Sequence, residues 1–138
     1  MSPVLKDKVA IITGASRGIG KAFALRFAEE GAKLLITTTS LERAKGTVKE
    51  VKAKGAEVAV IEADISFEKD TKKIADKVMQ QYGKVDILVN NAAIWYGINI
   101  TPWDAWTTED WDRIFTVNVR GTCLLYTSPS PRDRQKAR

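Results

Sequence analysis

The amino-acid sequence predicts an α/β domain, with parallel strands in one sheet and helices on both of its faces. Short apolar segments without polar alternation occur four times, as is typical of strands buried on both sides. Stretches with apolar residues three or four positions apart separate them, as expected of helices. This alternation gives parallel strands joined by right-handed crossovers. We therefore expect a doubly wound parallel sheet, truncated after the fourth strand and fourth helix.

Each strand and helix has its own pattern. The segments expected to be strands are Val9–Thr13, Leu34–Thr37, Val58–Ile61 and Ile87–Asn90. The apolar stripes expected on the helices are Ile19, Phe23 and Phe27, then Leu41, Ala44, Val48 and Val51, then Phe67, Thr71, Ile74, Val78 and Tyr82. A glycine follows each stripe, and a fourth helix is expected from about Thr108. The residues at expected N-cap positions are Ser40, Ser66 and Thr107.

Length and composition place the chain among ordinary globular domains. It has 138 residues, of which 44% are apolar and 28% charged, so wholesale disorder is excluded. No apolar run approaches the roughly 20 residues of a membrane span, and we expect no membrane partner. The sequence contains no histidine, the commonest metal ligand, and one cysteine, Cys123. We expect no metal site and a reducing, cytoplasmic location.

The positive charge is unevenly distributed. The formal net charge is +5, and residues 123–138 supply +3 of it from four Lys/Arg and one Asp. Residues 1–122 contain 18 Lys/Arg and 16 Asp/Glu, which gives only +2. Because the basic excess belongs to the end of the chain, we expect no nucleic-acid partner for the rest.

The first strand leads directly into a glycine-rich turn, Thr13–Gly20. Glycines 14, 18 and 20 lie between a strand and a helix, with the spacing G-x3-G-x-G. Such a turn lets backbone N–H groups approach a pyrophosphate, and the helix N-terminus favours its negative charge. A tight turn without a ligand is the alternative. The position after the first strand of a β-α-β pattern favours dinucleotide binding.

The turn resembles the cofactor signature of the short-chain dehydrogenases/reductases. The resemblance continues at Asp64-Ile65, at Asn90–Ala93 and at Asn118–Gly121, in the family's order and at its usual separations, and it covers residues 8–122. It is closest to the branch that contains 3-oxoacyl-carrier-protein reductases. It implies a Rossmann-like fold and an oxidoreductase that transfers a hydride between nicotinamide and a carbonyl or secondary alcohol. Ala93 stands where the family usually has glycine.

The end of the second strand predicts the preferred cofactor. An NAD site usually places an acid about 20 residues past the glycines, but none occurs here before Glu42. Thr39 offers a hydroxyl, and Arg17 lies inside the glycine turn, where it would pair with a 2′-phosphate. The family resemblance also associates this combination with NADP, and NAD is the less favoured alternative. A solvated loop charge at Arg17 and helix capping by Thr39 are the structural alternatives.

The resemblance also assigns the remaining site residues. Asp64 would accept a hydrogen bond from the adenine amino group, Ile65 would pack near the ring, and Asn91 would lie beside the cofactor. Asn118 would be catalytic, holding a water in a proton relay. The full set of expected cofactor-binding residues is Gly14, Ser16, Arg17, Gly18, Ile19, Gly20, Thr39, Asp64, Ile65, Asn91 and Ala92. Local turn formation by Asp64 and Asn91, and a bond inside the helix bundle for Asn118, are the alternatives.

The family's catalytic serine, tyrosine and lysine have no match in this chain. The only tyrosine after Asn118 is Tyr126, and the position four residues later is Ser130 rather than lysine. From Cys123 the sequence resembles the translation of a sequencing-library adapter. We therefore expect a dinucleotide-binding half, residues 1–122, a non-native tail, residues 123–138, and no catalytic activity in this form. A natural, disordered basic tail that binds RNA or a partner is the alternative.

Three functions agree with these features. The first is an NADP-dependent oxidoreductase acting on a small carbonyl or alcohol substrate. The second is a non-catalytic dinucleotide-binding sensor, and the third is a nucleic-acid-binding protein that uses the basic tail. The resemblance implies a parent homodimer or homotetramer built partly on the fourth helix. Four aromatic residues would either wall an apolar substrate pocket or anchor their loop against the fold or another subunit: Trp95, Tyr96, Trp103 and Trp106.

Overall fold

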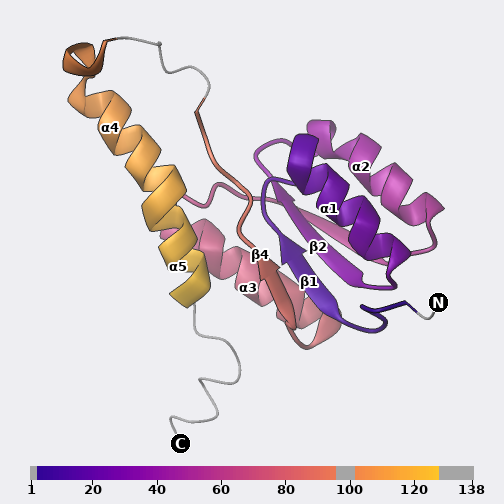
Figure 1. The fold of residues 1–138 in the computed structure, drawn as a ribbon. Helices are drawn as coiled ribbons and strands as arrows, with labels where there is room; N and C mark the ends of the chain where they lie inside the picture. The colour runs from indigo at the N-terminus through magenta and orange to yellow at the C-terminus, as the bar shows by residue number, and fades with distance from the viewer. Residues whose placement is uncertain (1–2, 96–101, 128–138) are drawn as a thin grey trace, which may run out of the picture.

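A computed structural model describes residues 3–95 and 102–127 (Figure 1). Its strands are β1 (Val9–Ile12), β2 (Lys33–Thr38), β3 (Val58–Glu62) and β4 (Ile87–Val89). They form one parallel sheet in the order β3-β2-β1-β4. The helices between them are α1 (Gly18–Glu29), α2 (Leu41–Ala53) and α3 (Glu68–Tyr82). A short 3₁₀-helix, η1 (Trp103–Ala105), then precedes α4 (Thr108–Phe115), the π-helix η2 (Thr116–Gly121) and α5 (Thr122–Thr127). The predicted doubly wound fold is confirmed.

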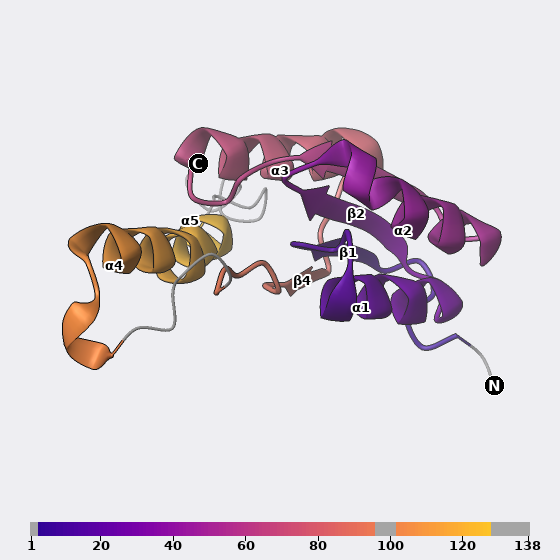
Figure 2. The same ribbon diagram turned by 90° about the horizontal axis from the view of Figure 1, so that it is seen from above.

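The core consists of two apolar layers, one on each side of the sheet. α1 and α2 pack on one face around Ala10, Ile12 and Leu34. α3 and α5 lie toward the opposite face, where Ile74 and Val78 pack with Ile11. Figure 2 shows α1 and α3 on opposite sides of the strands. Because both faces are covered, the central strands β1 and β2 carry continuous apolar runs, as the sequence pattern predicted.

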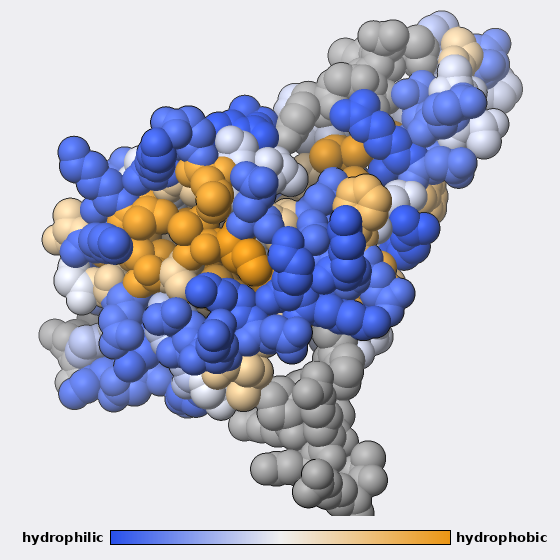
Figure 3. Space-filling view, turned by 180° about the vertical axis from the view of Figure 1, so that it is seen from behind, coloured by the Kyte–Doolittle hydropathy of each residue, from blue (hydrophilic) through white to orange (hydrophobic). Residues whose placement is uncertain are grey.

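The two outer strands are less well covered than the central ones. β4 pairs with β1 along one side, and its residues Ile87–Val89 are only half-buried. Val58–Ile61 of β3, at the other edge, are also half-buried. A space-filling view from behind shows a patch of hydrophobic residues bordered by hydrophilic ones (Figure 3). Because β4 pairs only with β1 among the described strands, it is an apolar strand at the edge of the described sheet.

The buried face of α1 differs from the prediction. Ile19 is 72% exposed and Phe23 40% exposed, whereas Gly20, Ala24 and Ala28 are buried. Small residues on the inner face let the helix approach the sheet closely, so they take the place expected for the large side chains. Two further members of the predicted stripes are also exposed, Leu41 of α2 and Phe67 before α3.

Only one predicted N-cap acts through its side chain. Thr107 precedes α4, and its hydroxyl accepts a hydrogen bond from the backbone N–H of Asp110 at 3.1 Å. Ser40 precedes α2 without such a bond. The cap of α3 is Phe67 rather than Ser66, so that prediction is wrong by one residue. The N–H of Ser66 donates to the carboxylate of Asp64, so Ser66 belongs to the turn before the helix.

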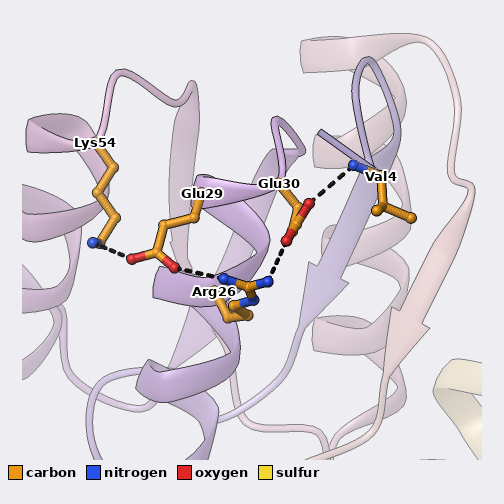
Figure 4. Close-up of polar contacts among 5 residues, drawn as sticks. All are labelled: Val4, Arg26, Glu29, Glu30 and Lys54. Carbon is orange, nitrogen blue, oxygen red and sulfur yellow. Dashed lines mark hydrogen bonds and ion pairs between the residues drawn. The ribbon is translucent and has the colours of Figure 1, made fainter. Parts of the chain in front are cut away.

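Ion pairs hold the N-terminal segment and the ends of α1 and α2 together (Figure 4). Glu29 accepts hydrogen bonds from Lys54 at 2.5 Å and from Arg26 at 3.2 Å. Arg26 also pairs with Glu30, whose other oxygen accepts from the backbone N–H of Val4 at 2.9 Å. Lys54, followed by Arg26, lowers the pKa of Glu29. The network fastens the side of the domain where these two helices end.

The last helical segment continues farther than expected. The expected non-native tail begins at Cys123, but helical structure continues into it, because α5 extends to Thr127. Leu125 is only 6% exposed and packs in the same apolar cluster as Ile74 and Val78. Burial of this leucine against α3 accounts for the extra helical turn. In the described residues, no helix is long and apolar enough to cross a membrane.

Candidate dinucleotide-binding site

A cavity of about 850 Å³ opens at the carboxyl ends of the strands. Open α/β sheets bind their ligands at this end, and the volume lies within the range of roughly 300–1,000 Å³ common for small-molecule sites. All the predicted cofactor-binding residues except Gly20 line it: Gly14, Ser16, Arg17, Gly18, Ile19, Thr39, Asp64, Ile65, Asn91 and Ala92. Residues that sequence reasoning did not assign also line it: Thr37, Thr38, Arg43, Ala63, Ala93, Ile94 and Val117.

Two glycines of the turn are required for different reasons. Gly14 has φ +66°, and a Cβ there would lie 3.0 Å from the Cα of Ala92. Gly20 does not line the cavity. A Cβ on Gly20 would lie 2.5 Å from Nδ2 of Asn91 and 2.6 Å from the carbonyl oxygen of Gly14. Gly20 therefore lets α1 pack directly against the turn, which is a positioning role rather than a ligand contact.

The glycine turn is fixed by its neighbours in β2 and α2. The N–H of Ala15 donates to the carbonyl of Thr37 at 3.1 Å, and the hydroxyl of Thr47 donates to the carbonyl of Ser16 at 3.1 Å. α1 begins at Gly18, so the N–H groups of its first turn have no acceptor within the helix. Gly18 and Ile19 line the cavity, where this helix end favours an anion.

Asn91 ties the turn to the end of β4. Its Nδ2 donates to the carbonyls of Thr13 and Gly14 at 3.0 and 3.2 Å. The hydroxyl of Thr13 accepts from the backbone N–H groups of Asn91 and Ala92 at 3.0 and 2.9 Å. The structural tie is therefore present, and Asn91 also faces the cavity.

Asp64 organises the loop between β3 and α3. Its Oδ1 accepts from the N–H of Ser66 at 2.9 Å, which is the local turn that the sequence left as an alternative. Its own N–H donates to Oδ2 of Asp70 at 2.9 Å, and this bond is the main cause that lowers the pKa of Asp70. Ile65 is buried beside Gly121, where a Cβ would lie 2.7 Å from the Ile65 carbonyl oxygen. Gly121 therefore allows the π-helix to pack on this loop.

The β2 end of the cavity contains a basic residue that sequence reasoning missed. Arg43, in the first turn of α2, lines the cavity, and its Nη2 donates to Oγ1 of Thr39 at 3.0 Å. Glu62 lies near the same helix end, where its Oε2 accepts from the N–H of Leu41 at 3.3 Å, but it does not line the cavity. A spacing of four residues between Thr39 and Arg43 was the only sequence signal for this contact.

Asn118 lies in the π-helix and does not line the cavity. Its Nδ2 donates to the carbonyl of Ile94 at 2.9 Å, and its Oδ1 accepts from the N–H of Ile94 at 2.8 Å. It therefore binds the loop after β4 and not another helix. π-Helical turns occur frequently at functional sites. Ile94 and Val117 line the cavity, so Asn118 acts on its wall through Ile94.

The aromatic residues after β4 are not gathered at one place. Trp95 lines the cavity and is 79% exposed, whereas Trp103 is 88% exposed on η1 and does not line it. The ring of Trp106 lies 5.9 Å from that of Trp111 and anchors the start of α4. Tyr96, Ser128 and Ser130 lie outside the described residues. Tyr126 is exposed on α5.

Within residues 3–95 and 102–127, no group of His, Cys, Asp or Glu side chains is arranged to hold a metal ion.

The strand, glycine turn and helix at one end of a parallel sheet define an α/β domain of the dinucleotide-binding class.

The chain belongs to the short-chain dehydrogenase family, whose model matches residues 8–137. An uncharacterized oxidoreductase of Thermotoga maritima is 45% identical over 120 residues, which are 87% of this chain and 46% of that protein. A short-chain dehydrogenase of Burkholderia cenocepacia, solved with NADP, is 38% identical with a TM-score of 0.81, and the match covers 88% of this chain and 49% of that one. An NAD+-bound xylitol dehydrogenase is 31% identical with a TM-score of 0.85, covering 91% and 47%.

The chain thus spans about half the length of these relatives. The family resemblance and the amino-terminal placement predicted from the sequence are confirmed. The family match continues past residue 122 and marks no boundary there. The division into residues 1–122 and 123–138 stays a prediction.

Proposed function

We propose that the full-length protein is an NADP-dependent oxidoreductase that transfers a hydride between nicotinamide and a small carbonyl or secondary alcohol. The observation that carries the cofactor choice is the β2 end of the cavity. Arg17, Thr39 and Arg43 line the cavity, whereas Glu62 at the end of β3 accepts from the N–H of Leu41 and does not line it. Asp64 is the acid among the described lining residues, and it follows β3 rather than β2. An NAD site would present a carboxylate to the ribose 2′-hydroxyl at this point, and a 2′-phosphate would be repelled by one.

The residues of this chain would hold the two halves of the dinucleotide differently. The start of α1, at Gly18 and Ile19, would offer backbone N–H groups to the pyrophosphate. Asp64 and Ile65 lie at the end of β3, where they would contact the adenine. Asn91 and Ala92 would lie along the nicotinamide half. When bound, the nicotinamide supplies or accepts the hydride.

Asn118 would support the reaction from the wall of the site. Its two hydrogen bonds fix the backbone of Ile94, which together with Trp95 borders the cavity. The proposed role for Asn118 in a proton relay requires the serine, tyrosine and lysine that this chain lacks. Trp95 is the described aromatic residue in position to contact an apolar substrate.

Turnover by the full-length protein tests this proposal. Its reading frame should encode a strand that ends in serine and then Tyr-x3-Lys, in a chain of roughly 250 residues. The protein should reduce a ketone with NADPH and oxidise a secondary alcohol with NADP+. A frame without Tyr-x3-Lys, in a protein that binds NADPH but turns over no substrate, would favour the alternative of a dinucleotide-binding sensor.

Residues 123–138 are proposed to be a non-native tail. The support is their resemblance to adapter sequence and the +3 charge that they add. Resequencing the source DNA across codons 120–135 shows whether these residues are native. Independent reads that carry the Cys123–Arg138 codons followed by a stop codon would show that the tail is natural. A natural tail would make RNA or partner binding the function to test by deleting it.

The parent is further proposed to be a cytoplasmic homodimer or homotetramer. The support for assembly is an exposed apolar stripe on α4 and η2, formed by Trp111 (52% exposed), Phe115 (49%) and Val119 (48%). The rings of Trp111 and Phe115 lie 5.3 Å apart. Stripes of this kind on a helix normally mark an interface. Light scattering of the full-length Phe115→Glu variant should give a smaller particle than the wild type.

A further inference from the structure

Thr47 is a buried residue of α2 whose hydroxyl bonds outside its own helix. It is only 1% exposed and does not line the cavity. A threonine inside a helix commonly donates to a carbonyl of the preceding turn of that helix, as Thr71 of α3 does to Glu68 at 2.8 Å. Thr47 instead donates to the carbonyl of Ser16 at 3.1 Å, 31 residues earlier in the chain. Its hydroxyl therefore satisfies the glycine turn and not α2.

Donors from other segments hold several carbonyl groups of the glycine turn. Asn91 donates to the carbonyls of Thr13 and Gly14, and Thr47 donates to that of Ser16. A carbonyl oxygen carries the negative end of the peptide dipole, so a carbonyl directed into the cavity would repel a phosphate group. Ser16 lines the cavity. The direction of its carbonyl therefore matters to any anion bound there.

The peptide unit between Ser16 and Arg17 connects this carbonyl to the N-terminus of α1. Because a trans peptide is planar, a bond to the Ser16 carbonyl fixes the orientation of the whole unit. α1 begins directly after it, at Gly18, and the N–H groups of its first turn have no acceptor within the helix. An ion pair between Lys21 and Glu50, at 2.8 Å, also links α1 with α2. Contacts from α2 thus help to fix how the anion-binding end of α1 is presented.

We propose that Thr47 is a positioning residue of the dinucleotide site, and that its hydroxyl holds the Ser16 carbonyl away from the pyrophosphate. This inference rests on the proposed function, because it requires a dinucleotide in the cavity. Thr47 does not line the cavity, so it acts on the ligand through Ser16. The hydroxyl carries this role, because an apolar side chain of the same shape would leave the carbonyl without its donor.

Two ligands separate the pyrophosphate from the rest of the cofactor. 2′-Phospho-ADP-ribose contains the pyrophosphate, whereas adenosine 2′-monophosphate lacks it but keeps the adenine and the 2′-phosphate. Their dissociation constants are measured by calorimetry on the full-length protein. Thr47→Val should weaken binding of 2′-phospho-ADP-ribose roughly three- to tenfold, the range expected for one hydrogen bond, and change binding of adenosine 2′-monophosphate by less than about twofold. Thr47→Ser keeps the hydroxyl and should recover most of the affinity.

Thr71→Val is the matched control. It also removes the hydroxyl of a buried threonine, but this hydroxyl bonds within α3 and Thr71 does not line the cavity. Both dissociation constants should stay within about twofold of the wild type. Thr47→Ala repeats the test without placing a methyl group against the Ser16 carbonyl, and thermal unfolding shows that each variant is folded during the titration.

Three results would overturn the assignment of Thr47. The first is a loss of affinity for 2′-phospho-ADP-ribose below about threefold in the folded Thr47→Val or Thr47→Ala variant. The second is an equal loss for adenosine 2′-monophosphate, and the third is an equal loss in Thr71→Val. Each would show that the hydroxyl of Thr47 has no particular effect on the pyrophosphate.

The design separates this inference from the proposed function. If the wild type prefers 2′-phospho-ADP-ribose to ADP-ribose and Thr47→Val binds it normally, the choice of NADP stands and only the role of Thr47 is refuted. If the wild type binds both forms equally, the preference for NADP is wrong. Thr47 is then judged on ADP-ribose against adenosine, and a loss of at least about threefold confined to ADP-ribose upholds its role. A wild type that binds none of these ligands refutes both proposals.

Discussion

Asn118 and the backbone of Ile94 form two reciprocal hydrogen bonds, at 2.9 and 2.8 Å, across the space between the π-helix and the loop after β4. The side-chain amide of Asn118 thus satisfies both backbone polar groups of one residue that borders the cavity. The π-helix η2 and the cofactor loops are therefore joined at this point. A second link joins them farther along, where Nη2 of Arg120 donates to the carbonyl of Ser66 at 3.2 Å.

Asn118→Leu should destabilise the fold by about 1–3 kcal/mol, since it leaves the N–H and carbonyl of Ile94 without their partners. Urea unfolding of the full-length protein measures the change. Asn118→Asp retains an acceptor for the Ile94 N–H and should lose less. Equal stability of Asn118→Leu and the wild type would contradict the role of this pair in holding the loop.

Gly20→Ala should disrupt the site, because the added Cβ would meet Asn91 Nδ2 and the Gly14 carbonyl oxygen. Such overpacking costs about 1–3 kcal/mol and would displace the turn that faces the pyrophosphate. Gly46→Ala is the control on α2, where a Cβ meets no atom within 4 Å, and it should stabilise the fold by about 0.5–1 kcal/mol. Thermal unfolding and NADPH binding are measured for both variants. Normal binding by Gly20→Ala would refute the packing argument.

Asp70 should contribute to stability in a pH-dependent manner. Its pKa is lowered from 3.8 in the folded state, mainly because the carboxylate accepts from the N–H of Asp64. A depressed carboxyl pKa stabilises the fold above the unfolded value, and this contribution is lost as pH falls below 3.8 toward the folded pKa. Asp70→Asn should therefore flatten the fall in unfolding free energy in that acidic range. Asp76→Asn, an exposed change on α3, is the control for charge. A curve for Asp70→Asn that is parallel to the wild type would contradict this assignment.

The 138-residue chain alone should show no dehydrogenase activity and should aggregate. It lacks Tyr-x3-Lys, and its apolar strand β4 is a half-buried edge, which invites pairing with other chains. Light scattering and an NADPH turnover assay of the isolated chain measure both properties. A monomer that unfolds cooperatively would count against the expected aggregation, and measurable turnover would refute the expected lack of activity.

The sequence predicted those features that depend on local patterns. Apolar runs such as Leu34–Thr37 identified the strands, and the glycine turn placed the site at the end of β1. The inner face of α1 was wrongly predicted, because Ile19 and Phe23 dominate its apolar pattern while Ala24 and Ala28 form the contact surface. Alanines do not identify the buried face of a helix from sequence, because their burial depends on how closely the helix approaches the sheet.

Contacts between segments that are far apart in the chain could not be predicted from the sequence. The contact of Arg43 with the cavity depends on where α2 begins and on how its first turn lies beside Thr39. The partner of Asn118 depends on the π-helix, which has no recognised sequence pattern. The burial of Leu125 depends on the position of α3. Each of these residues is an ordinary member of a helical segment until the fold brings its partner close.

The relative affinity of the full-length protein for NADPH and NADH decides whether the cavity beside β2 selects the phosphorylated cofactor. Both dissociation constants are measured by titration under one buffer condition, for the wild type and for Arg17→Ala. We expect the wild type to bind NADPH at least roughly tenfold more tightly than NADH, and Arg17→Ala to lose most of this preference. A wild-type protein that binds NADH as tightly as NADPH, or more tightly, would contradict it.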